Sequence, residues 1–250
     1  MRTTTLDQSL RGRVALLTGA SGGIGQALAL ALAREGATLA LSYGSGKDAA
    51  SALAERITEE GGTALVVGAD MSDEHDPAHL VEEVEQELGP IEVLVGNAGR
   101  GKIRSLEELS VAEFDRTYAI NVRAPFLLAQ AVLPGMSERR FGRVVFMSSA
   151  AAFTGGIVGA HYASSKAGLN GLTHYLASRF AASGVTINAV APALIAETGM
   201  LPGTPEQLIS QIPVQRLGRP EEVADLTVSI LRNPFITNQV VSIDGGINPR

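Results

Sequence analysis

The chain has 250 residues, of which 45% are hydrophobic and 18% charged, and its formal net charge is -6 at pH 7. The length fits one large α/β domain, and the acidic balance offers no basic surface for nucleic acid. The absence of cysteine excludes disulfides, thiolate catalysis and cysteine zinc sites, and no apolar run reaches the roughly 18 residues of a membrane span. We therefore expect a cytoplasmic protein that binds neither nucleic acid nor membrane.

Short apolar runs alternate with segments of helical period along the whole chain. In order, the predicted elements are strand 13–18, helix 24–35, strand 37–42, helix 47–60, strand 63–70, helix 76–89, strand 91–97, a helical region 106–138 interrupted near Pro125 and ending by Pro134-Gly135, strand 143–149, helix 161–183, strand 185–192, helix 219–232 and strand 239–243. Strands that are apolar on both faces and separated by helices indicate a parallel sheet covered on both sides. We predict one domain over 1–250, a doubly wound parallel sheet of about seven strands with helices on both faces, known as the Rossmann fold.

A glycine-rich stretch, "TGASGGIG" at 18–25, links the first predicted strand to the first helix. Gly19, Gly23 and Gly25 would let the backbone turn tightly and approach a diphosphate. The helix that starts near Ile24 would offer free N–H groups and the positive end of its dipole. The alternative is a glycine-rich turn that binds no ligand.

Tyr162 and Lys166 are four residues apart on a predicted helix and so share one face. A cation about 4 Å from a phenolate is worth about 4 kcal/mol at an effective dielectric near 20. That would lower the tyrosine pKa by roughly three units, to near 7, where it suits general acid–base catalysis. Ser149 closes the fifth strand, where a hydroxyl could bind a substrate carbonyl, although Ser148-Ser149 could simply end the strand. The four histidines form no metal set, so we expect no metal site.

At this point the sequence resembles the short-chain dehydrogenase/reductase family, from about residue 12 to 248. The motifs that carry the resemblance are "TGASGGIG" (18–25), "AD" (69–70), "GNAG" (96–99), Asn121, "SS" (148–149), "YASSK" (162–166), "AP" (191–192) and "DGG" (244–246). The resemblance implies an oxidoreductase that moves a hydride between a nicotinamide and a carbonyl or secondary alcohol.

The resemblance also implies a role for each matching residue. In the catalytic set, Tyr162 would protonate the carbonyl oxygen, Lys166 would bind the nicotinamide ribose and lower the tyrosine pKa, Ser149 would polarise the carbonyl, and Asn121 would hold a water that relays protons to Lys166. In the cofactor set, the diphosphate would be bound by Gly19, Ser21, Gly23, Ile24 and Gly25. The adenine would contact Asp70, with Met71 beside it, and the ribose would lie between Asn97, Ala98 and Gly99. The nicotinamide would contact Pro192 and Ile195.

The end of the second strand bears on the choice of cofactor. NAD-specific enzymes place an acid there for the ribose 2′-hydroxyl, but this strand ends "ALSYGSGK" with no acid before Asp48. Ser42, Tyr43, Ser45 and Lys47 could receive a 2′-phosphate instead. Gly22 stands where family members that use NADP often carry a basic residue. We therefore favour NADP(H), with NAD(H) as the alternative.

The closest subgroup is the 3-oxoacyl-[acyl-carrier-protein] reductases, in which basic residues near the mouth of the site meet an acidic carrier protein. Arg139 and Arg140 could serve here, whereas the second basic position is Ser183. The alternatives are an NAD-dependent dehydrogenase of a free alcohol, sugar or ketone, and a non-enzymatic NADP-sensing or scaffold protein.

Three loops are expected to contact the substrate: 100–105, 150–160 and 193–212, the last with the composition of a lid. The family further implies a homotetramer that pairs the helices of 106–138 and 161–183. Four departures from the family pattern matter, and two of them are Ala193 in place of the usual glycine after Pro192 and Arg179 where an acid is common. Gly96 replaces the usual asparagine, and an extra residue in "LIAETGM" leaves open whether Glu197 or Thr198 faces the cofactor.

Overall fold

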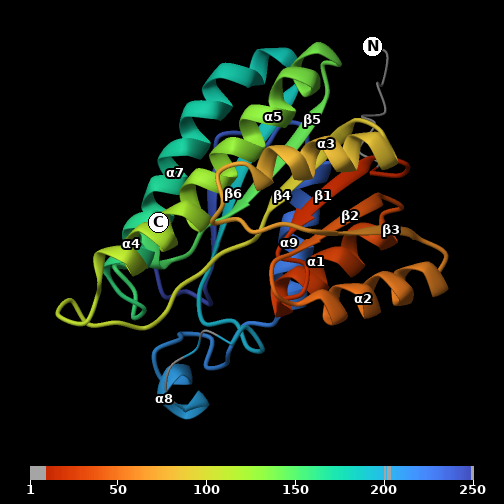
Figure 1. The fold of residues 1–250 in the computed structure, drawn as a ribbon. Coiled ribbons are helices and arrows are strands. Elements are labelled where there is room, and N and C mark those ends of the chain that lie inside the picture. Colours follow the sequence, from red (N-terminus) through yellow and green to blue (C-terminus); the bar gives the residue numbers. More distant parts are fainter. Residues whose placement is uncertain (1–9, 200, 202–203, 249–250) are drawn as a thin grey trace, which may run out of the picture.

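Seven strands form one sheet in the order β3-β2-β1-β4-β5-β6-β7, and each neighbouring pair is parallel (Figure 1). The computed structural model describes residues 10–199, 201 and 204–248. The predicted doubly wound parallel sheet is thereby confirmed. The strands are β1 (Val14–Thr18), β2 (Thr38–Tyr43), β3 (Thr63–Gly68), β4 (Ile91–Gly96), β5 (Gly142–Met147), β6 (Val185–Pro192) and β7 (Val240–Ile243).

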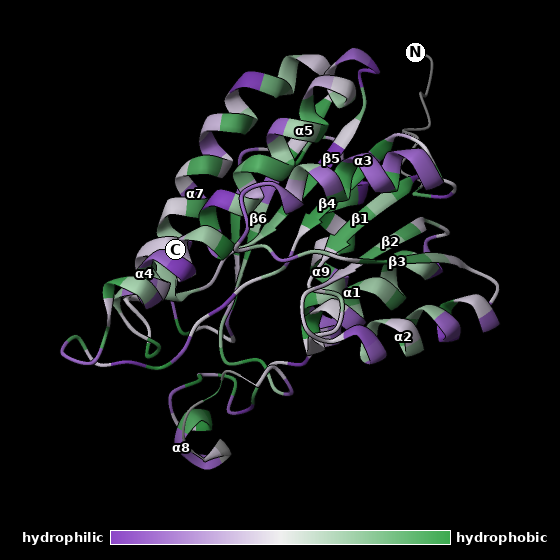
Figure 2. Cartoon of the chain, in the orientation of Figure 1, coloured by the Kyte–Doolittle hydropathy of each residue, from purple (hydrophilic) through white to green (hydrophobic). Residues whose placement is uncertain are grey.

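Helices cover both faces of the sheet, which explains why the strands are apolar on both sides. Leu16 belongs to one buried cluster, with side chains from α3, α5 and α7, whereas its neighbour Leu17 belongs to a second cluster, with side chains from α1, α2 and α9. Figure 2 shows the mainly hydrophobic strands between helices that carry hydrophilic bands, such as α2 and α3. The helices are α1 (Gly23–Arg34), α2 (Lys47–Glu59), α3 (Asp76–Leu88), α4 (Val111–Tyr118), α5 (Ala124–Glu138), α6 (Ala151–Thr154), α7 (Ala160–Phe180), α8 (Pro205–Ile209) and α9 (Pro220–Arg232).

The predicted helical region 106–138 is divided in the structure. It consists of α4, a π-helical turn over Ala119–Arg123, and α5. The prediction that it ends by Pro134-Gly135 is wrong, because α5 continues through Pro134 to Glu138. The flanking Leu133 and Met136 are buried in the core, and their burial offsets the roughly 3 kcal/mol that proline costs inside a helix.

The strand order positions the functional site. The chain runs from β1 outward through β2 to β3 and then returns to the other side of β1 at β4. In such sheets the carboxyl ends of the two strands at the reversal border a crevice. The glycine-rich stretch follows β1, and Asn97 follows β4, so both lie at this crevice. Within the described residues, no helix is long and apolar enough to cross a membrane.

Candidate active site

The glycine-rich turn after β1 has the geometry of a diphosphate site. Gly19 has a φ of +67°, a conformation that side chains rarely adopt. A Cβ on Gly25 would lie 2.2 Å from the Gly19 carbonyl oxygen, so only glycine lets α1 pack this closely on the turn. No side chain caps the start of α1 and its first turn holds no acid. Its free N–H groups and dipole therefore suit an anion such as a dinucleotide diphosphate.

Asn97 joins the end of β4 to the glycine-rich turn. Its Nδ2 donates to the carbonyl oxygens of Thr18 and Gly19, each at 3.0 Å. The Thr18 hydroxyl in turn accepts hydrogen bonds from the backbone N–H groups of Asn97 and Ala98, at 3.1 and 3.0 Å. Four hydrogen bonds thus fix the two sides of the crevice relative to each other.

The absent asparagine at position 96 has a packing explanation. Gly96 in β4 pairs with Phe146 in β5, and a Cβ on Gly96 would lie 2.7 Å from Phe146 Cδ1. The Phe146 ring is fully buried and occupies the space that a side chain at 96 would need. The buried ring therefore explains why glycine suits position 96.

The four predicted catalytic residues come from three elements. Ser149 follows β5, Tyr162 and Lys166 share one face of α7, and Asn121 lies in the π-helical turn. The Ser149 hydroxyl lies close enough to the Tyr162 phenol to oppose the rise in the phenol's pKa, and its Oγ donates to the Pro192 carbonyl at 3.5 Å. Lys166 Nζ donates to the carbonyl oxygen of Met147 at 2.6 Å. The structure thus brings Ser149, Tyr162 and Lys166 together at the carboxyl end of the sheet.

Asn121 lies beside this group, and both polar atoms of its side chain have hydrogen-bond partners. Its Oδ1 accepts from the backbone N–H of Arg100 at 2.8 Å, and its Nδ2 donates to the Arg100 carbonyl at 2.9 Å and to Ser165 Oγ at 3.0 Å. A Cβ on Gly99 would lie 3.2 Å from Lys166 Nζ and 3.6 Å from Asn121 Oδ1, so both side chains border the same glycine. The water that Asn121 is expected to hold stays a prediction.

The expected drop in the Tyr162 pKa is not found in the chain by itself. Burial raises the pKa of the phenol, and the hydrogen bond from Ser149 only partly opposes this. Lys166 does not offset the effect of burial on this pKa; its Nζ lies 5.7 Å from the centroid of the Tyr162 ring and donates to the Met147 carbonyl. Burial also lowers the pKa of Lys166 to about 8, which weakens its positive charge near neutral pH.

One cavity of about 480 Å³ joins the glycine-rich turn to the catalytic side chains. Thirteen of the predicted residues line it: Gly19, Ser21, Gly23, Ile24, Gly25, Asn97, Ala98, Gly99, Ser149, Tyr162, Lys166, Pro192 and Ile195. Thr198 also lines it and Glu197 does not, so the contact of Thr198 with the cofactor is the prediction that we keep. Both Leu194 and Glu197 adopt positive φ, of 50° and 60°, a conformation uncommon for residues other than glycine.

Three predicted cofactor residues do not line this cavity. Ser42 is only 1% exposed, so Ser45 and Lys47, both exposed beside the start of α2, are the more accessible of the groups proposed for a 2′-phosphate. Asp70 is exposed after β3, and hydrogen bonds from the Ser72 hydroxyl and N–H lower its pKa. Met71 is buried. The adenine contact expected of Asp70 stays a prediction.

Some residues that line the cavity were not anticipated from the sequence. Met147, whose carbonyl binds Lys166, and Ile247, near the C-terminal end, both line the cavity, yet no motif marks either of them.

The two arginines expected near the mouth of the site lie elsewhere in a single chain. Arg139 and Arg140 precede β5 and therefore lie at the amino edge of the sheet, opposite the cavity. Arg139 Nη2 donates there to the carbonyl of Ile91, the first residue of β4. The predicted lid 193–212 is described except for residues 200, 202 and 203.

The residues present therefore fit a dinucleotide at one end of the cavity and an acid–base reaction at the other. In the described part of the chain no group of histidine, aspartate or glutamate could hold a metal. Anion-binding turn, Rossmann sheet and Ser–Tyr–Lys cluster together define a nicotinamide-dependent oxidoreductase.

Comparison with known proteins identifies the family. A family model described as short chain dehydrogenase matches residues 13–208. The chain is 35% identical to the 3-oxoacyl-[acyl-carrier-protein] reductase of Synechocystis sp. over 242 residues, covering 96% of this chain and 98% of that protein. A reductase of the same name from Staphylococcus epidermidis is 34% identical over 239 residues, covering 93% of this chain and 98% of the other.

Solved structures agree with this result. A blue fluorescent protein from a metagenomic library, in complex with NADPH, has a TM-score of 0.90 and 32% identity, covering 96% of this chain and 100% of that one. A short-chain dehydrogenase/reductase from Serratia marcescens has a TM-score of 0.90 and 33% identity, covering 96% and 99%. The chain belongs to the short-chain dehydrogenase/reductase family and is an NAD(P)-dependent oxidoreductase.

Proposed function

We propose that the chain reduces a carbonyl group to a secondary alcohol with NADPH, and that its substrate is a 3-oxoacyl thioester or a related ketone. The observation that carries this proposal is the meeting of Ser149, Tyr162 and Lys166 at one end of a cavity whose other end is the anion-binding turn. When bound, the nicotinamide supplies the hydride. The Ser149 hydroxyl holds the substrate oxygen, and the Tyr162 phenol donates the proton that this oxygen gains.

Burial gives Tyr162 the right starting state for reduction. Because burial raises its pKa, the phenol carries its proton throughout the neutral range and is ready to donate it. Lys166 lies next to it with a pKa of about 8, so this amine can gain or lose a proton near neutral pH. That property suits a group that restores the tyrosine proton after each turnover.

The preference for NADPH is supported by the groups near the start of α2. Ser45 and Lys47 are exposed, and α2 begins at Lys47 without a side-chain cap. A Cβ on Gly46 would lie 2.7 Å from Ser21 Cβ and Oγ, which places this loop against the glycine-rich turn. A 2′-phosphate would meet one lysine and no carboxylate before Asp48.

A free ketone is the second candidate substrate, and one observation favours it. Arg139 and Arg140 lie at the opposite edge of the sheet from the cavity, so within one chain they cannot receive a carrier protein at the mouth of the site. Among the described residues that line the cavity, Lys166 is the only ionisable side chain besides Tyr162. A small, uncharged ketone needs nothing more from this cavity.

We also propose a homotetramer that pairs α5 and α7 with their mates. The exposed sides of these helices carry Phe126, which is 43% exposed, and Tyr175, which is 60% exposed. Gly168 and Gly171 leave room beside Tyr175 for a close helix approach. Light scattering after size exclusion should give about four times the 26.0 kDa chain mass, and a monomer would contradict this.

Absorbance assays test the proposed reaction directly. Acetoacetyl thioesters, ethyl acetoacetate and simple ketones are offered with NADPH or NADH, and alcohols with NADP or NAD. We expect reduction with NADPH, and a rate at least about 100-fold lower for Tyr162→Phe, since the proton donor is lost. Activity with NADH alone would overturn the cofactor assignment. Full activity of Tyr162→Phe would overturn the mechanism.

A further inference from the structure

The loop between β4 and α4 forms part of the wall around the Tyr162 phenol. A Cβ on Gly101 would lie 2.6 Å from Tyr162 Cδ2 and 2.9 Å from Val158 Cγ1. The loop backbone therefore packs directly on the proposed acid–base residue. Residues 100–105 have no regular secondary structure, so individual contacts hold the loop in this position. Asn121 binds the backbone of Arg100 at the start of the loop, and the contacts at its other end come from one residue.

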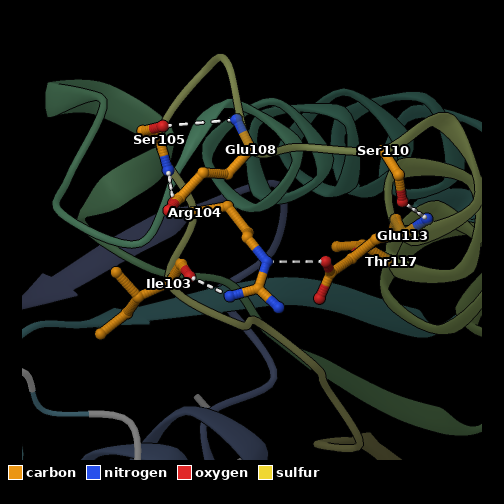
Figure 3. A network of polar contacts seen from close by, with 7 residues as sticks. All are labelled: Ile103, Arg104, Ser105, Glu108, Ser110, Glu113 and Thr117. Atoms are coloured by element: carbon orange, nitrogen blue, oxygen red, sulfur yellow. Dashed lines mark hydrogen bonds and ion pairs between the residues drawn. The ribbon is translucent and has the colours of Figure 1, made fainter.

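Arg104 provides these contacts (Figure 3). Its backbone N–H donates to the Val158 carbonyl at 3.0 Å, which joins the loop to the segment that precedes α7. Its side chain donates from Nε to Glu113 Oε2 at 3.0 Å and from Nη1 to the Ile103 carbonyl at 3.0 Å. Its own carbonyl oxygen would lie 2.8 Å from a Cβ on Gly159. One residue thus connects this loop, α4 and the start of α7.

Glu113 is a fixed partner for this arginine. It stands in the first turn of α4, where its backbone N–H donates to the Ser110 hydroxyl at 3.2 Å. Thr117 donates its hydroxyl to the Glu113 carbonyl at 2.9 Å. Figure 3 shows the carboxylate directed toward the guanidinium. The anchor is therefore part of a capped helix and not a free surface carboxylate.

The Arg104–Glu113 ion pair is less exposed than a surface ion pair of the same chain, so it should stabilise the loop more strongly. The two side chains are 26% and 18% exposed, compared with 54% and 50% for the ion pair Arg56–Glu60 on α2. Partial burial lowers the effective dielectric and reduces screening by salt, so the more buried pair interacts more strongly. Arg56–Glu60, on the outer helix α2, serves as its matched control.

We infer that Arg104 is a positioning residue for Tyr162. Its ion pair with Glu113 holds Gly101 and Val158 against the phenol and keeps water from the ring. The role in catalysis rests on the proposed function, whereas the effect on the phenol environment does not. Loss of the ion pair should admit water to Tyr162, and its pKa should then fall toward the ordinary value of 10, because burial is what raises it.

Tyrosinate absorbance at 295 nm tests this in the cofactor-free protein. Subtracting the spectrum of Tyr162→Phe in each background isolates the Tyr162 signal from the other three tyrosines. At pH 10, Arg104→Gln should show at least about twice the ionised fraction of the parent, and Arg56→Gln should match the parent. An Arg104→Gln signal equal to that of the parent would overturn the inference.

Coupling between the two partners provides the second test. Glu113→Gln should reproduce the absorbance change, and the double variant should add nothing to it. Exchange of the two residues, Arg104→Glu with Glu113→Arg, should restore at least half of the parent behaviour. If Arg104→Gln does not fold, Glu113→Gln decides, since it breaks the ion pair but leaves the Arg104 side chain and its bond to the Ile103 carbonyl in place. Full additivity of the two single effects would contradict a shared ion pair.

Turnover completes the comparison. Under the proposed reaction, Arg104→Gln should lower kcat by about tenfold, less than the roughly 100-fold that a 1 Å misplacement can cost, and should leave the KM for NADPH unchanged. An unchanged kcat together with a raised cofactor KM would refute positioning of the phenol. If the parent itself reduces no carbonyl, the proposed function fails while the absorbance test of the loop contact still stands.

Discussion

Gly96→Ala tests whether the Phe146 ring is the reason for the unusual glycine before Asn97. The added methyl would lie 2.7 Å from Cδ1 and 3.3 Å from Cε1 of a fully buried ring on the neighbouring strand. The φ of Gly96 lies outside the left-handed region, so the cost is steric and not conformational. Overpacking of this kind costs about 1–3 kcal/mol, and we expect about 2 kcal/mol of lost stability.

Urea unfolding measures this cost. With an m-value of about 3 kcal/mol/M, a loss of 2 kcal/mol lowers the midpoint by about 0.7 M. The protomer concentration must be held constant, because assembly shifts the apparent stability. A shift below about 0.2 M would mean that the ring moves aside freely, and the packing explanation would be wrong.

Phe146→Leu supplies the control for this prediction. Leucine removes the ring atoms that the new methyl would meet, so Gly96→Ala should cost about 1 kcal/mol less in this background than in the parent. Residues in contact show such coupling, whereas independent sites add. Simple additivity would therefore refute the steric reasoning even if Gly96→Ala alone were destabilising.

Two further predictions concern the cofactor end of the site and its lysine. A Cβ on Gly23 would lie 2.3 Å from the Glu197 carbonyl oxygen, so Gly23→Ala should displace the backbone around Glu197. We expect the KM for NADPH to rise at least about tenfold. Unchanged steady-state kinetics would contradict this close packing. Lys166→Met should abolish turnover yet stabilise the fold by about 2 kcal/mol at pH 7. The pKa of Lys166 is about 8 in the folded protein and 10.5 as a free side chain, a difference that costs the fold about 3 kcal/mol at this pH. The hydrogen bond to Met147 offsets about 1 kcal/mol of that cost. Between about pH 8 and 10.5 the unfolded chain binds a proton that the folded chain has lost, so the parent gains stability as the pH rises. The stability difference between Lys166→Met and the parent should therefore be smaller at pH 10 than at pH 7 in urea unfolding, and a larger difference at pH 10 would contradict the prediction.

Local sequence predicts most of the strands and helices of this fold. Central strands such as β1 and β5 are buried on both faces and alternate with amphipathic helices such as α2 and α9, so this alternation along the chain reveals the elements without knowledge of their neighbours. Gly25 follows the same local logic, because a Cβ there would meet atoms of Gly19 and Ala20, whereas a Cβ on Gly19 would meet Ala98 and Asn97 after β4, which only the fold brings close. Pro134 shows the limit of local reasoning. Tertiary burial of Leu133 and Met136 carries α5 past a residue that normally ends a helix.

Motif and spacing predict that Ser149, Tyr162 and Lys166 form one acid–base group, and the fold places all three along one cavity. The protonation behaviour of these groups depends on the packing of the whole chain. The Tyr162 pKa is raised and not lowered, because desolvation depends on everything packed around the phenol, and Lys166 binds a carbonyl of β5 that no spacing rule identifies. The same holds for Arg104, whose partners Glu113 and Val158 come from segments that only the fold brings together. Distances between remote segments and the loss of solvent around a charge are properties of the packed chain, and local sequence does not encode them.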